Sequence, residues 1–422
     1  MTAGPGAPDA GAPAPDTGPL AGVRVVEVAT HVFVPMAGSL LGAWGAEVIK
    51  VEHVERGDAM RGLGSTGVMY LGSGVHVLLE HSNRGKKSIG LDLSKPEGVD
   101  ILYKLAAQCD VFLTNKMPGV RQRLHIDVDD IRGHNPNIVY VRGSGYGARG
   151  PEADRGGYDQ ISFWCRGGSA MGAKPQEWDH IPIQPAPGYG DSLGGMTIAG
   201  GICAALLHRE RTGEATVVDV SLLATGMWAM SPAIALSQQL GAPWLQMPAD
   251  NTAIRNPLVR TYRTSDDRWI ALSMLQGFFY WPEMLQVIGR EELLDDPRFN
   301  THEALQDNAP EATQILAEVF ASDTFDNWKK HLSNIKGQWS PVQDSLEVVD
   351  DPQTVANGYV LETHTKDGTP FKLVTTPVQF DDEPSPPGRA PEFNEHGDDI
   401  LTQDLGIDWD TVVDLKVRGI VA

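Results

Sequence analysis

Residues 23–52 have the sequence VRVVEVATHVFVPMAGSLLGAWGAEVIKVE. Val23–Val28 and Glu47–Glu52 are β-branched, mainly apolar runs with the length of a buried strand, and Pro35–Trp44 between them has the composition of a buried helix. A strand, a helix and a second strand in this order form a parallel βαβ unit, because parallel strands need a crossover connection. The stretch therefore predicts an open α/β sheet.

The same alternation continues beyond this unit. Further strands are predicted at 111–113, 138–141 and 216–220, and helices at 96–108, at 192–211 and from 221 past 228. Ser94-Lys95-Pro96-Glu97 has the spacing of a capping box, with Pro96 in the first turn of the helix that follows. Alternating strands and helices are typical of doubly wound, Rossmann-like sheets.

The pattern of predicted strands and helices changes after Pro257. A strand predicted at 269–274 is followed by amphipathic helices at 278–288, 311–320 and 325–332, which predict a second, smaller domain. Beyond Ser340 short strands return, with Asp367-Gly368 as a hairpin signal between two of them, and a helical segment is expected near 398–405. The run of Ala, Pro, Gly and Asp at 1–19 predicts a disordered tail.

The charge balance narrows the classes of partner. The chain has 422 residues, with 34 Lys and Arg against 55 Asp and Glu and a formal net charge of -21. This balance disfavours nucleic acid and anionic lipid surfaces, so an anionic ligand needs a local cluster of donors. No run reaches the roughly 18 to 20 apolar residues of a membrane span, and the N-terminus lacks the layout of a secretory signal. We therefore expect a cytoplasmic protein.

The cysteines Cys109, Cys165 and Cys203 are widely separated and show no C-x-x-C spacing. They are too few for a disulfide framework, and their spacing does not suit a metal. We therefore expect buried free thiols and no metal site.

The strongest local motif is Gly188-Tyr189-Gly190-Asp191-Ser192-Leu193-Gly194-Gly195-Met196. Asp is a favoured helix N-cap that stabilises by about 1 kcal/mol, so spacing alone favours a structural cap. In the other interpretation the Asp191 carboxylate is a nucleophile, and the backbone N–H groups of Gly194 and Gly195 approach a developing oxyanion. Glycine costs about 1 kcal/mol per residue inside a helix, which indicates close backbone approach here.

Two further motifs each allow two interpretations. Gly143-Ser144-Gly145-Tyr146-Gly147 follows a strand but lacks the G-x-G-x-x-G spacing of a dinucleotide loop, which favours a turn or an active-site loop. Asn83-Arg84-Gly85-Lys86-Lys87-Ser88 is a basic cluster in an acidic protein. Its more common interpretation is a solvated face, and the alternative is a site where Lys and Arg gather the phosphates of an anionic cofactor.

In their order along the chain, these motifs resemble the class III CoA-transferases, also called the CaiB/BaiF family. The N-terminal part of the family's sequences resembles this chain at 20–28 (LAGVRVVEV), 41–52 (LGAWGAEVIKVE), Gly57-Asp58 and Arg61. The match continues through 83–93, Asn115 with Pro118-Gly119, Asn135-Pro136, 188–196, 208–214 (HRERTGE), Asp351-Pro352-Gln353 and Glu395-His396. The spaced set covers about Leu20 to Ile420 and is far more specific than any one motif.

The resemblance implies that Asp191 is the catalytic aspartate of an acyl-CoA:carboxylate CoA-transferase. By analogy with the family, Asp191 attacks the thioester of a donor acyl-CoA to form an aspartyl anhydride. CoA then moves to an acceptor carboxylate through a second anhydride and an aspartyl-CoA thioester. A carboxylate is ionised at neutral pH, so it needs no general base, and the anhydride keeps the acyl group activated without ATP.

The family also contains α-methylacyl-CoA racemases, which pair this aspartate with a histidine. Tyr158 occupies that position in Gly157-Tyr158-Asp159-Gln160, and a phenol with a pKa of about 10 is a poor base at neutral pH. His180 lies in the same loop region and is an alternative base. Epimerisation is therefore a second candidate function, and a CoA-binding protein that has lost activity is a third.

For CoA binding, the resemblance implies Val32, His53, Leu91, Leu93, Asn115 and Arg123. His53 departs from the family, where an arginine commonly contacts the adenosine phosphates. The segment 31–35 also lacks the glutamine of formyl-CoA transferases, and the glycine-rich closing loop of those enzymes has no obvious counterpart. These departures disfavour a formyl or oxalyl substrate.

The architecture implied by the resemblance is a large α/β domain made of 20–229 and 340–422, a smaller α+β domain at 230–339, and a homodimer of interlocked rings. Coenzyme A enters as the acyl-CoA substrate. Trp228, Trp244 and Trp281 are candidates for lining an acyl pocket, although burial in a core is the more common role of tryptophan. A bulky apolar acyl group is our hypothesis, and the sequence does not identify the donor or the acceptor acid.

Overall fold

The computed structural model describes residues 18–64, 74–246 and 253–422. The tail predicted at 1–19 therefore lies almost entirely outside the described residues. The chain forms two compact units. The first consists of the residues up to Ala173 with Ile181–Trp244 and Gln353–Ala422, and the second consists of Lys174–His180 with Leu245–Pro352.

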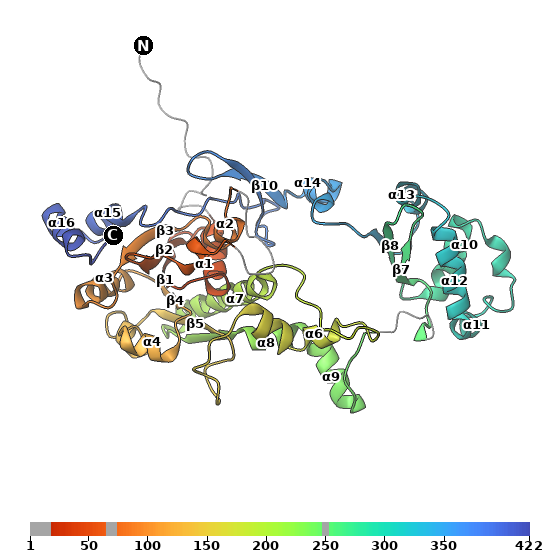
Figure 1. The fold of residues 1–422 in the computed structure, drawn as a ribbon, viewed down its shortest axis with the longest axis horizontal. Coiled ribbons are helices and arrows are strands. Elements are labelled where there is room, and N and C mark those ends of the chain that lie inside the picture. The colour runs from red at the N-terminus through yellow and green to blue at the C-terminus, as the bar shows by residue number, and fades with distance from the viewer. Residues whose placement is uncertain (1–17, 65–73, 247–252) are drawn as a thin grey trace, which may run out of the picture. The chain divides into compact units, whose positions relative to one another are not determined.

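A six-stranded parallel sheet forms the centre of the first unit, in the order β3-β2-β1-β4-β5-β6 (Figure 1). Its strands are β1 (Arg24–Val28), β2 (Glu47–His53), β3 (Lys87–Leu91), β4 (Val111–Thr114), β5 (Val139–Ser144) and β6 (Val217–Ser221). Neighbouring strands all pair in parallel. The predicted βαβ unit and α/β sheet are confirmed, and the strand order reverses between β1 and β4.

One face of the sheet is covered by α1 (Phe33–Ala43) and α7 (Tyr189–Thr212). Successive residues of a strand point to opposite faces, so Val25 packs on this side while Val26 packs on the other. The core on this side is continuous from the strands through α1 into the inner face of α7.

The other face is covered by α3 (Pro96–Ala106) and by the C-terminal helices α15 (Gly397–Asp399) and α16 (Trp409–Val417). Leu401 and Val412 from the C-terminal segment are fully buried in the same core as the strand residues. The last part of the chain therefore completes the sheet that its first part begins.

Shorter elements of the first unit connect and flank these layers. They are η1 (Ala59–Gly62), α2 (Val77–Asn83), α4 (Pro118–Arg123), α5 (Val128–Arg132), η2 (Gln160–Cys165), α6 (Ser169–Gly172), α8 (Leu222–Ala229), α9 (Ser231–Leu240), η6 (Ile400–Asp404) and the hairpin of β10 (Val360–His364) with β11 (Pro370–Val374). The hairpin predicted at Asp367-Gly368 is confirmed by the antiparallel pairing of β10 and β11.

The capping box predicted at the start of α3 is wrong. Lys95 is the N-cap residue and makes no side-chain capping bond. The Ser94 hydroxyl instead donates to the Asp92 carboxylate at 2.6 Å. The Ser94 hydroxyl is therefore bonded to Asp92 and does not cap the helix. A local bond between side chains two residues apart competes with the bond to the helix backbone.

The second unit combines a small antiparallel sheet with a group of helices. Its elements are β7 (Val259–Arg263), β8 (Trp269–Ser273), α10 (Gly277–Val287), η4 (Glu291–Leu294), α11 (His302–Asp307), α12 (Ala309–Phe320), α13 (Phe325–Leu332), β9 (Trp339–Pro341) and η5 (Glu347–Val349), and α14 (Pro352–Ala356) begins at its C-terminal boundary. The three helices predicted after Pro257 match α10, α12 and α13. Apart from Lys174–His180, the second unit begins at Leu245 and ends at Pro352, and α9 belongs to the first unit.

Among the described residues, α7 is the one helix that is long and apolar enough to span a membrane by length and composition. Its side chains Ile198, Ala199 and Ile202 are fully buried against the sheet and α1. The apolar character of α7 therefore follows from its position as a core helix.

The cysteines differ in exposure. Cys109 is buried, Cys203 is half-buried and Cys165 is exposed, and all three are free. The expectation of buried thiols is therefore wrong for Cys165. Burial raises the pKa of the Cys109 thiol to about 12, which makes it unreactive at neutral pH.

Candidate active site

A cavity of about 460 Å³ opens in the first unit where the strand order reverses. Residues that follow β1, β4 and β5 line it, together with the start of α7. They include Thr30, His31, Asn115, Gly143, Tyr158 and Asp191. Ligands of open α/β sheets bind outside the carboxyl ends of the strands at such a reversal, so the fold itself identifies this cavity as the candidate site.

Asn115 joins the two loops that meet at the reversal. Its side-chain amide donates to the Thr30 carbonyl at 2.7 Å, and its side-chain oxygen accepts the Thr30 N–H at 3.1 Å. The loop after β4 is thereby fixed to the loop after β1, and Asn115 lies in the wall of the cavity.

Asp191 lies in the first turn of α7 but does not cap it. The N-cap is Gly188, whose φ of 71° is in the left-handed region that favours glycine. The Asp191 carboxylate faces the cavity, and its Oδ1 atom is buried without a hydrogen-bond partner among the residues that the structure describes. Burial, followed by repulsion from Asp159, raises the pKa of this carboxyl well above its ordinary value. The N-cap interpretation is therefore wrong.

Asp159 supplies the cap that Asp191 does not. Its carboxylate oxygens both accept the Gly190 N–H at 3.1 Å, and the side-chain amide of Gln184 donates to Oδ2 at 3.0 Å. In the sequence, Asp159 stands out only as the neighbour of Tyr158. Its role as a cap leaves no local signal, because Gly190, whose N–H it accepts, lies 31 residues further along the chain.

Gly194 and Gly195 serve the packing of α7 against α1. A Cβ atom on Gly194 would lie 2.3 Å from Cε2 of Phe33, and one on Gly195 would lie 2.5 Å from Cβ of Met36. Both residues lie beyond the first turn, where the backbone N–H groups bond to carbonyls within the helix. Their N–H groups are therefore not free for an oxyanion, and the role predicted for them there is wrong.

His31 is the histidine that the structure brings into the cavity. Its φ of 69° is rare for a residue other than glycine, and its backbone N–H donates to the Asp58 carboxylate at 3.0 Å. Its ring packs edge-on against Tyr158, with centroids 5.7 Å apart. Burial lowers the pKa of His31, so the ring is neutral at physiological pH and able to accept a proton.

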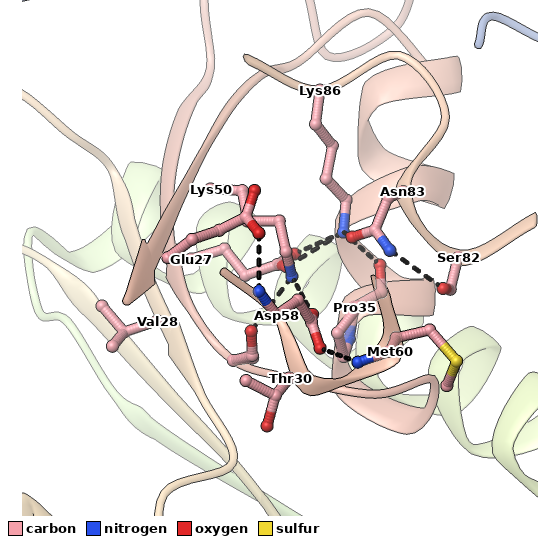
Figure 2. A network of polar contacts seen from close by, with 12 residues as sticks. Glu27, Val28, Thr30, Pro35, Lys50, Asp58, Met60, Ser82, Asn83 and Lys86 are labelled. Carbon is pink, nitrogen blue, oxygen red and sulfur yellow. Dashed lines mark hydrogen bonds and ion pairs between the residues drawn. The ribbon is translucent and has the colours of Figure 1, made fainter. Parts of the chain in front are cut away.

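A buried ionic network holds the loop that carries His31 (Figure 2). The Lys50 ammonium contacts Asp58 at 2.7 Å, Glu27 at 3.1 Å and the Ala29 carbonyl at 3.0 Å. The Lys86 ammonium reaches Glu27 from the other side, at 2.8 Å. Burial of these charges without partners would cost several kcal/mol, so the network fixes the backbone from β1 to His31.

This network also corrects the interpretation of the basic cluster at 83–88. Asn83, Arg84 and Lys86 are buried, so the cluster is not a solvated face. Lys86 donates to Glu27 and to the Pro35 carbonyl at 2.7 Å, which engages it within the protein. Burial lowers the pKa of Lys86 to about 8.

The cationic side chains at the cavity are different ones. Lys116, Arg121, Arg142 and Arg155 line it, in a protein of net charge -21. Arg142 forms a bidentate pair with Asp219 at 2.5 and 2.8 Å, which holds its guanidinium at the wall. Such a local group of donors is what an anionic ligand requires here. The group is not visible in the sequence because its members come from separate segments, namely the turn after β4, helix α4, strand β5 and the loop after β5.

The other positions implied for CoA binding have varied surroundings. Val32 is buried, and a Cβ on Gly188 would lie 3.4 Å from it. Arg123 ends α4, next to the cavity residues Arg121 and Gln122. His53 is exposed at the end of β2 and its ring contacts the Arg56 guanidinium at 2.9 Å.

The two leucines implied for CoA binding lie at the end of β3. Leu91 is buried in the core of the C-terminal face, and Leu93 packs against the same core. Neither they nor His53 are among the described residues that line the cavity.

His180 lies in the second unit, not in the cavity of the first. Its ring stacks on Trp178 with centroids 4.8 Å apart and contacts the Asp179 carboxylate at 3.0 Å. Its side chain is largely exposed. Of the two histidines, His31 is the one that is among the described residues lining the cavity.

Of the three candidate tryptophans, Trp244 lines an apolar cavity. This second cavity of about 560 Å³ also contains Tyr189 and Leu193, which flank Asp191 on α7. Trp228 is 80% exposed, and Trp281 is buried in the core of the second unit. The part of the chain that the structure describes contains no group of three or more His, Cys, Asp or Glu arranged to hold a metal.

Comparison with known proteins identifies relatives of this chain in sequence and in fold. A model of CoA-transferase family III matches residues 20–397. The (R)-2-hydroxy-4-methylpentanoate CoA-transferase of Clostridioides difficile is 31% identical over 406 residues, which cover 95% of this chain and 99% of that protein. The cinnamoyl-CoA:phenyllactate CoA-transferase of Clostridium sporogenes is 28% identical over 92% of this chain and 94% of its own. A crystal structure of a CaiB/BaiF family protein from Brucella suis superposes with a TM-score of 0.76 at 27% identity, covering 92% of this chain and 99% of that one.

Proposed function

Because this chain belongs to CoA-transferase family III, we propose that it moves coenzyme A from a donor acyl-CoA to an acceptor carboxylic acid, with Asp191 as the nucleophile. The resemblance found in the sequence motifs is thereby confirmed at the level of the family. The observation that carries the proposal is the Asp191 carboxylate, which lines the cavity with one oxygen buried and with no hydrogen-bond donor from the described part of the chain.

The first half of the proposed reaction loads Asp191. A carboxylate oxygen of Asp191 bonds to the acyl carbon of the thioester, the C–S bond breaks, and its electron pair leaves with the CoA thiolate. The thiolate then attacks the Asp191 carbonyl carbon of this anhydride, which releases the donor carboxylate and leaves CoA on Asp191 as a thioester.

The second half reverses these steps with a new acid. The acceptor carboxylate attacks the aspartyl-CoA thioester and expels the thiolate, which leaves a second aspartyl anhydride. The thiolate attacks the acyl carbon of the acceptor, forming the new acyl-CoA and restoring the Asp191 carboxylate. Acyl activation is conserved throughout, so no ATP is consumed.

The surroundings of Asp191 suit this chemistry. The partial burial of Asp191 limits the access of water, which would otherwise hydrolyse an anhydride. A carboxylate whose pKa is raised is also more basic, and therefore a stronger nucleophile, once it is ionised.

Coenzyme A carries phosphates, and the cationic side chains at the cavity are suited to them. Lys116, Arg121, Arg142 and Arg155 provide charge-assisted donors. We assign Asn115 to CoA binding as well, because it lies in the wall between these donors and the loop of His31. Val32, His53, Leu91, Leu93 and Arg123 remain proposed contacts from the family resemblance.

For the acyl group, we favour a bulky apolar acid. The cavity of Trp244 is lined mainly by apolar side chains, and it borders the same turn of α7 as Asp191 through Tyr189 and Leu193. Burial of an aromatic or branched acyl group there gains roughly 25 cal/mol for each Å² of apolar area removed from water.

The proposal is tested by trapping the intermediate. The protein is incubated with cinnamoyl-CoA and hydroxylamine, and its peptides are analysed by mass spectrometry. A hydroxamate on Asp191 is expected, and Asp191→Ala should abolish both the adduct and CoA transfer. Asp100→Ala, which removes an exposed carboxylate of α3, is the matched control. Full transfer activity in Asp191→Ala would refute the proposal, and a broad panel of acyl-CoAs without turnover would favour an inactive CoA-binding protein.

A second candidate function is epimerisation of α-methylacyl-CoA. It is favoured by one observation, the presence of a neutral imidazole at His31 in the same cavity as Asp191. Two bases near one α-carbon allow removal and return of its proton. Incubation of a 2-methylacyl-CoA in heavy water separates the functions, because epimerisation introduces deuterium at the α-carbon and CoA transfer does not.

We further infer a cytoplasmic homodimer of interlocked subunits, as the family resemblance implies. Large apolar side chains on α8 and α9 support an association surface, since Met227, Trp228 and Leu240 are exposed. Native mass spectrometry is expected to give twice the mass of 45.6 kDa, and a single-subunit mass at micromolar concentration would contradict the dimer.

A further inference from the structure

A second carboxylate stands beside the proposed nucleophile and takes no part in the covalent steps. We propose that Asp159 is a positioning residue for Asp191, because its carboxylate fastens the first turn of α7 and places a fixed negative charge next to the Asp191 carboxylate. This inference rests on the function proposed for Asp191, and it assigns a role to a residue outside the transfer itself.

Both oxygens of the Asp159 carboxylate accept hydrogen bonds. The side chain is buried, with 6% of its surface exposed. Its two oxygens accept the Gly190 N–H at 3.1 Å, the backbone N–H of Asp191 and the side-chain amide of Gln184 at 3.0 Å. It therefore binds the free N–H groups at the N-terminus of α7, where the helix dipole also favours a negative charge.

Gly190 is the residue that makes this approach possible. A Cβ on Gly190 would lie 2.4 Å from Oδ1 of Asp159 and 2.3 Å from Cγ of Phe163. Any side chain at Gly190 would push the Asp159 carboxylate away from the backbone that leads directly into Asp191. The glycine turn of the motif is thus shaped around Asp159.

The two carboxylates differ in their supply of donors. Asp159 accepts from three groups, whereas Oδ1 of Asp191 is buried and has no partner within residues 18–64, 74–246 and 253–422. The donors stabilise the ionised form of Asp159. Burial raises the pKa of both carboxyl groups, and repulsion by Asp159 adds to the rise at Asp191. Asp159 is therefore the first of the pair to ionise, and Asp191 is the more basic member.

Other titratable groups surround this turn on every side. They are His31 after β1, His81 of α2, Lys116 after β4, Tyr158 before η2 and Tyr189 of α7. His81 reaches the turn through the Ser192 hydroxyl at 3.3 Å, and burial lowers its pKa to about 4. It is therefore neutral above that pH, and the repulsion that acts on Asp191 comes from Asp159.

The charge of Asp159 has a consequence for acyl transfer. An ionised Asp191 is repelled by Asp159, whereas an acylated Asp191 is neutral and is not. When the Asp191 oxygen bonds to the acyl carbon and the C–S bond breaks, the negative charge moves to the departing thiolate and away from Asp159. The pair therefore favours the loading of Asp191, and Asp159 itself forms no bond to the substrate.

The first test measures the protonation of Asp191 without any reaction of CoA. A water-soluble carbodiimide with glycinamide labels protonated carboxyl groups, and peptide mass spectrometry reports the labelling of Asp191 across a pH series. Asp159→Asn keeps an oxygen that can accept the backbone N–H groups but removes the charge. The labelling midpoint should fall by about one pH unit, which is a tenfold change in the ratio of protonated to ionised Asp191.

Two further variants make the result specific. Gln184→Glu adds a carboxylate against Asp159, and it should move the midpoint in the opposite direction. Asp179→Asn changes a fully exposed carboxylate of the second unit and should leave the midpoint unchanged. An unchanged midpoint in both Asp159→Asn and Gln184→Glu would overturn the inference. Circular dichroism spectra that match the wild type are required for each variant.

The second test follows the hydroxamate at Asp191 with cinnamoyl-CoA and hydroxylamine. In Asp159→Asn, the pH at which adduct formation is half-maximal should fall with the labelling midpoint, and the plateau rate should decrease several-fold. If the labelling midpoint shifts in Asp159→Asn but the wild-type protein never forms an adduct, the proposed function alone is refuted. Adduct formation with an identical pH profile in Asp159→Asn would refute the role of Asp159 alone.

Discussion

Asn115 and Thr30 hydrogen-bond to one another twice, through the side-chain amide of Asn115 and both backbone polar groups of Thr30. This pair of bonds joins the loops at the point where the sheet reverses its strand order. Asn115→Asp keeps the acceptor for the Thr30 N–H but places a carboxylate oxygen against the Thr30 carbonyl. We expect a loss of about 1–3 kcal/mol in the free energy of unfolding, measured by urea denaturation. The exposed Asn137→Asp is the control and should change stability by less than about 0.5 kcal/mol.

Two glycines of α7 should respond oppositely to alanine. Gly194→Ala forces a methyl group into the Phe33 ring and should cost about 1–3 kcal/mol. Gly200→Ala, on the exposed side of the same helix with nothing within 4 Å, should stabilise by about 0.5–1 kcal/mol because alanine favours helices. Urea denaturation measures both changes. A lower free energy of unfolding in both Gly194→Ala and Gly200→Ala would contradict the assignment of Gly200 to an open, exposed side of α7.

Lys86 should make the stability of the fold depend on pH in the alkaline range. Its pKa is about 8 in the folded protein against an ordinary 10.5, so the unfolded chain binds more protons between these values. Stability should therefore rise as pH increases through this window. Lys86→Met should remove this rise, and it should cost about 3 kcal/mol at pH 7 because Glu27 loses a buried partner. Lys87→Met, which alters the half-exposed neighbour paired with Glu47, should retain the rise.

Asp191 should reduce the stability of the fold at the pH where it is ionised. The raised pKa of its carboxyl means that the folded protein holds the proton more tightly than the unfolded chain. The contribution of the bound proton to folding stability is complete below pH 3.8, which is the pKa of Asp191 in the unfolded chain. This contribution is lost as the pH rises through the pKa of Asp191 in the folded protein. Asp191→Asn should therefore unfold at a higher temperature at pH 8, with a gain of about 1 kcal/mol or more in the free energy of unfolding. Equal melting temperatures for wild type and Asp191→Asn at pH 8 would contradict the burial of an ionised group.

Trp244 should determine the preference for the acyl group. Trp244→Ala removes aromatic area from the apolar cavity and should raise the KM for cinnamoyl-CoA about tenfold, with a smaller effect on acetyl-CoA. Trp409→Ala, which removes an exposed tryptophan of α16, should leave both values unchanged. Steady-state kinetics with the two donors measures the difference. A similar change in KM for both donors would argue against an acyl pocket at Trp244.

The sheet was predictable because each strand carries its own local signal. Val23–Val28 and Glu47–Glu52 are β-branched and apolar, and they match β1 and β2 within a residue or two. Asp191 was also predictable as a special residue, because a glycine turn beside a buried helix is visible in the sequence. The helices of the second unit followed from their amphipathic spacing.

The remaining features depend on contacts between distant parts of the chain. Lys86 appeared solvated because its counter-charge, Glu27, lies 59 residues away. Asp191 appeared to be a cap because the true cap, Asp159, comes from another element. His31 was available from its place directly after β1, but its entry into the cavity depends on Asp58 and on a left-handed backbone. Pairings of this kind are set by the tertiary fold and leave no local periodic signal.

The covering of the sheet by C-terminal helices has a consequence for synthesis on the ribosome. Leu91 at the end of β3 forms a bridge with Val421, and Leu401 and Val412 fill the core on that face. While the ribosome translates the second unit, α3 covers only part of this face of the sheet, and the rest of its apolar surface stays exposed until the C-terminal segment has been made. Nascent chains are then prone to stick to one another, and a chaperone that binds apolar segments should increase the yield of this protein more than that of a variant whose C-terminal segment is moved ahead of β1 by circular permutation.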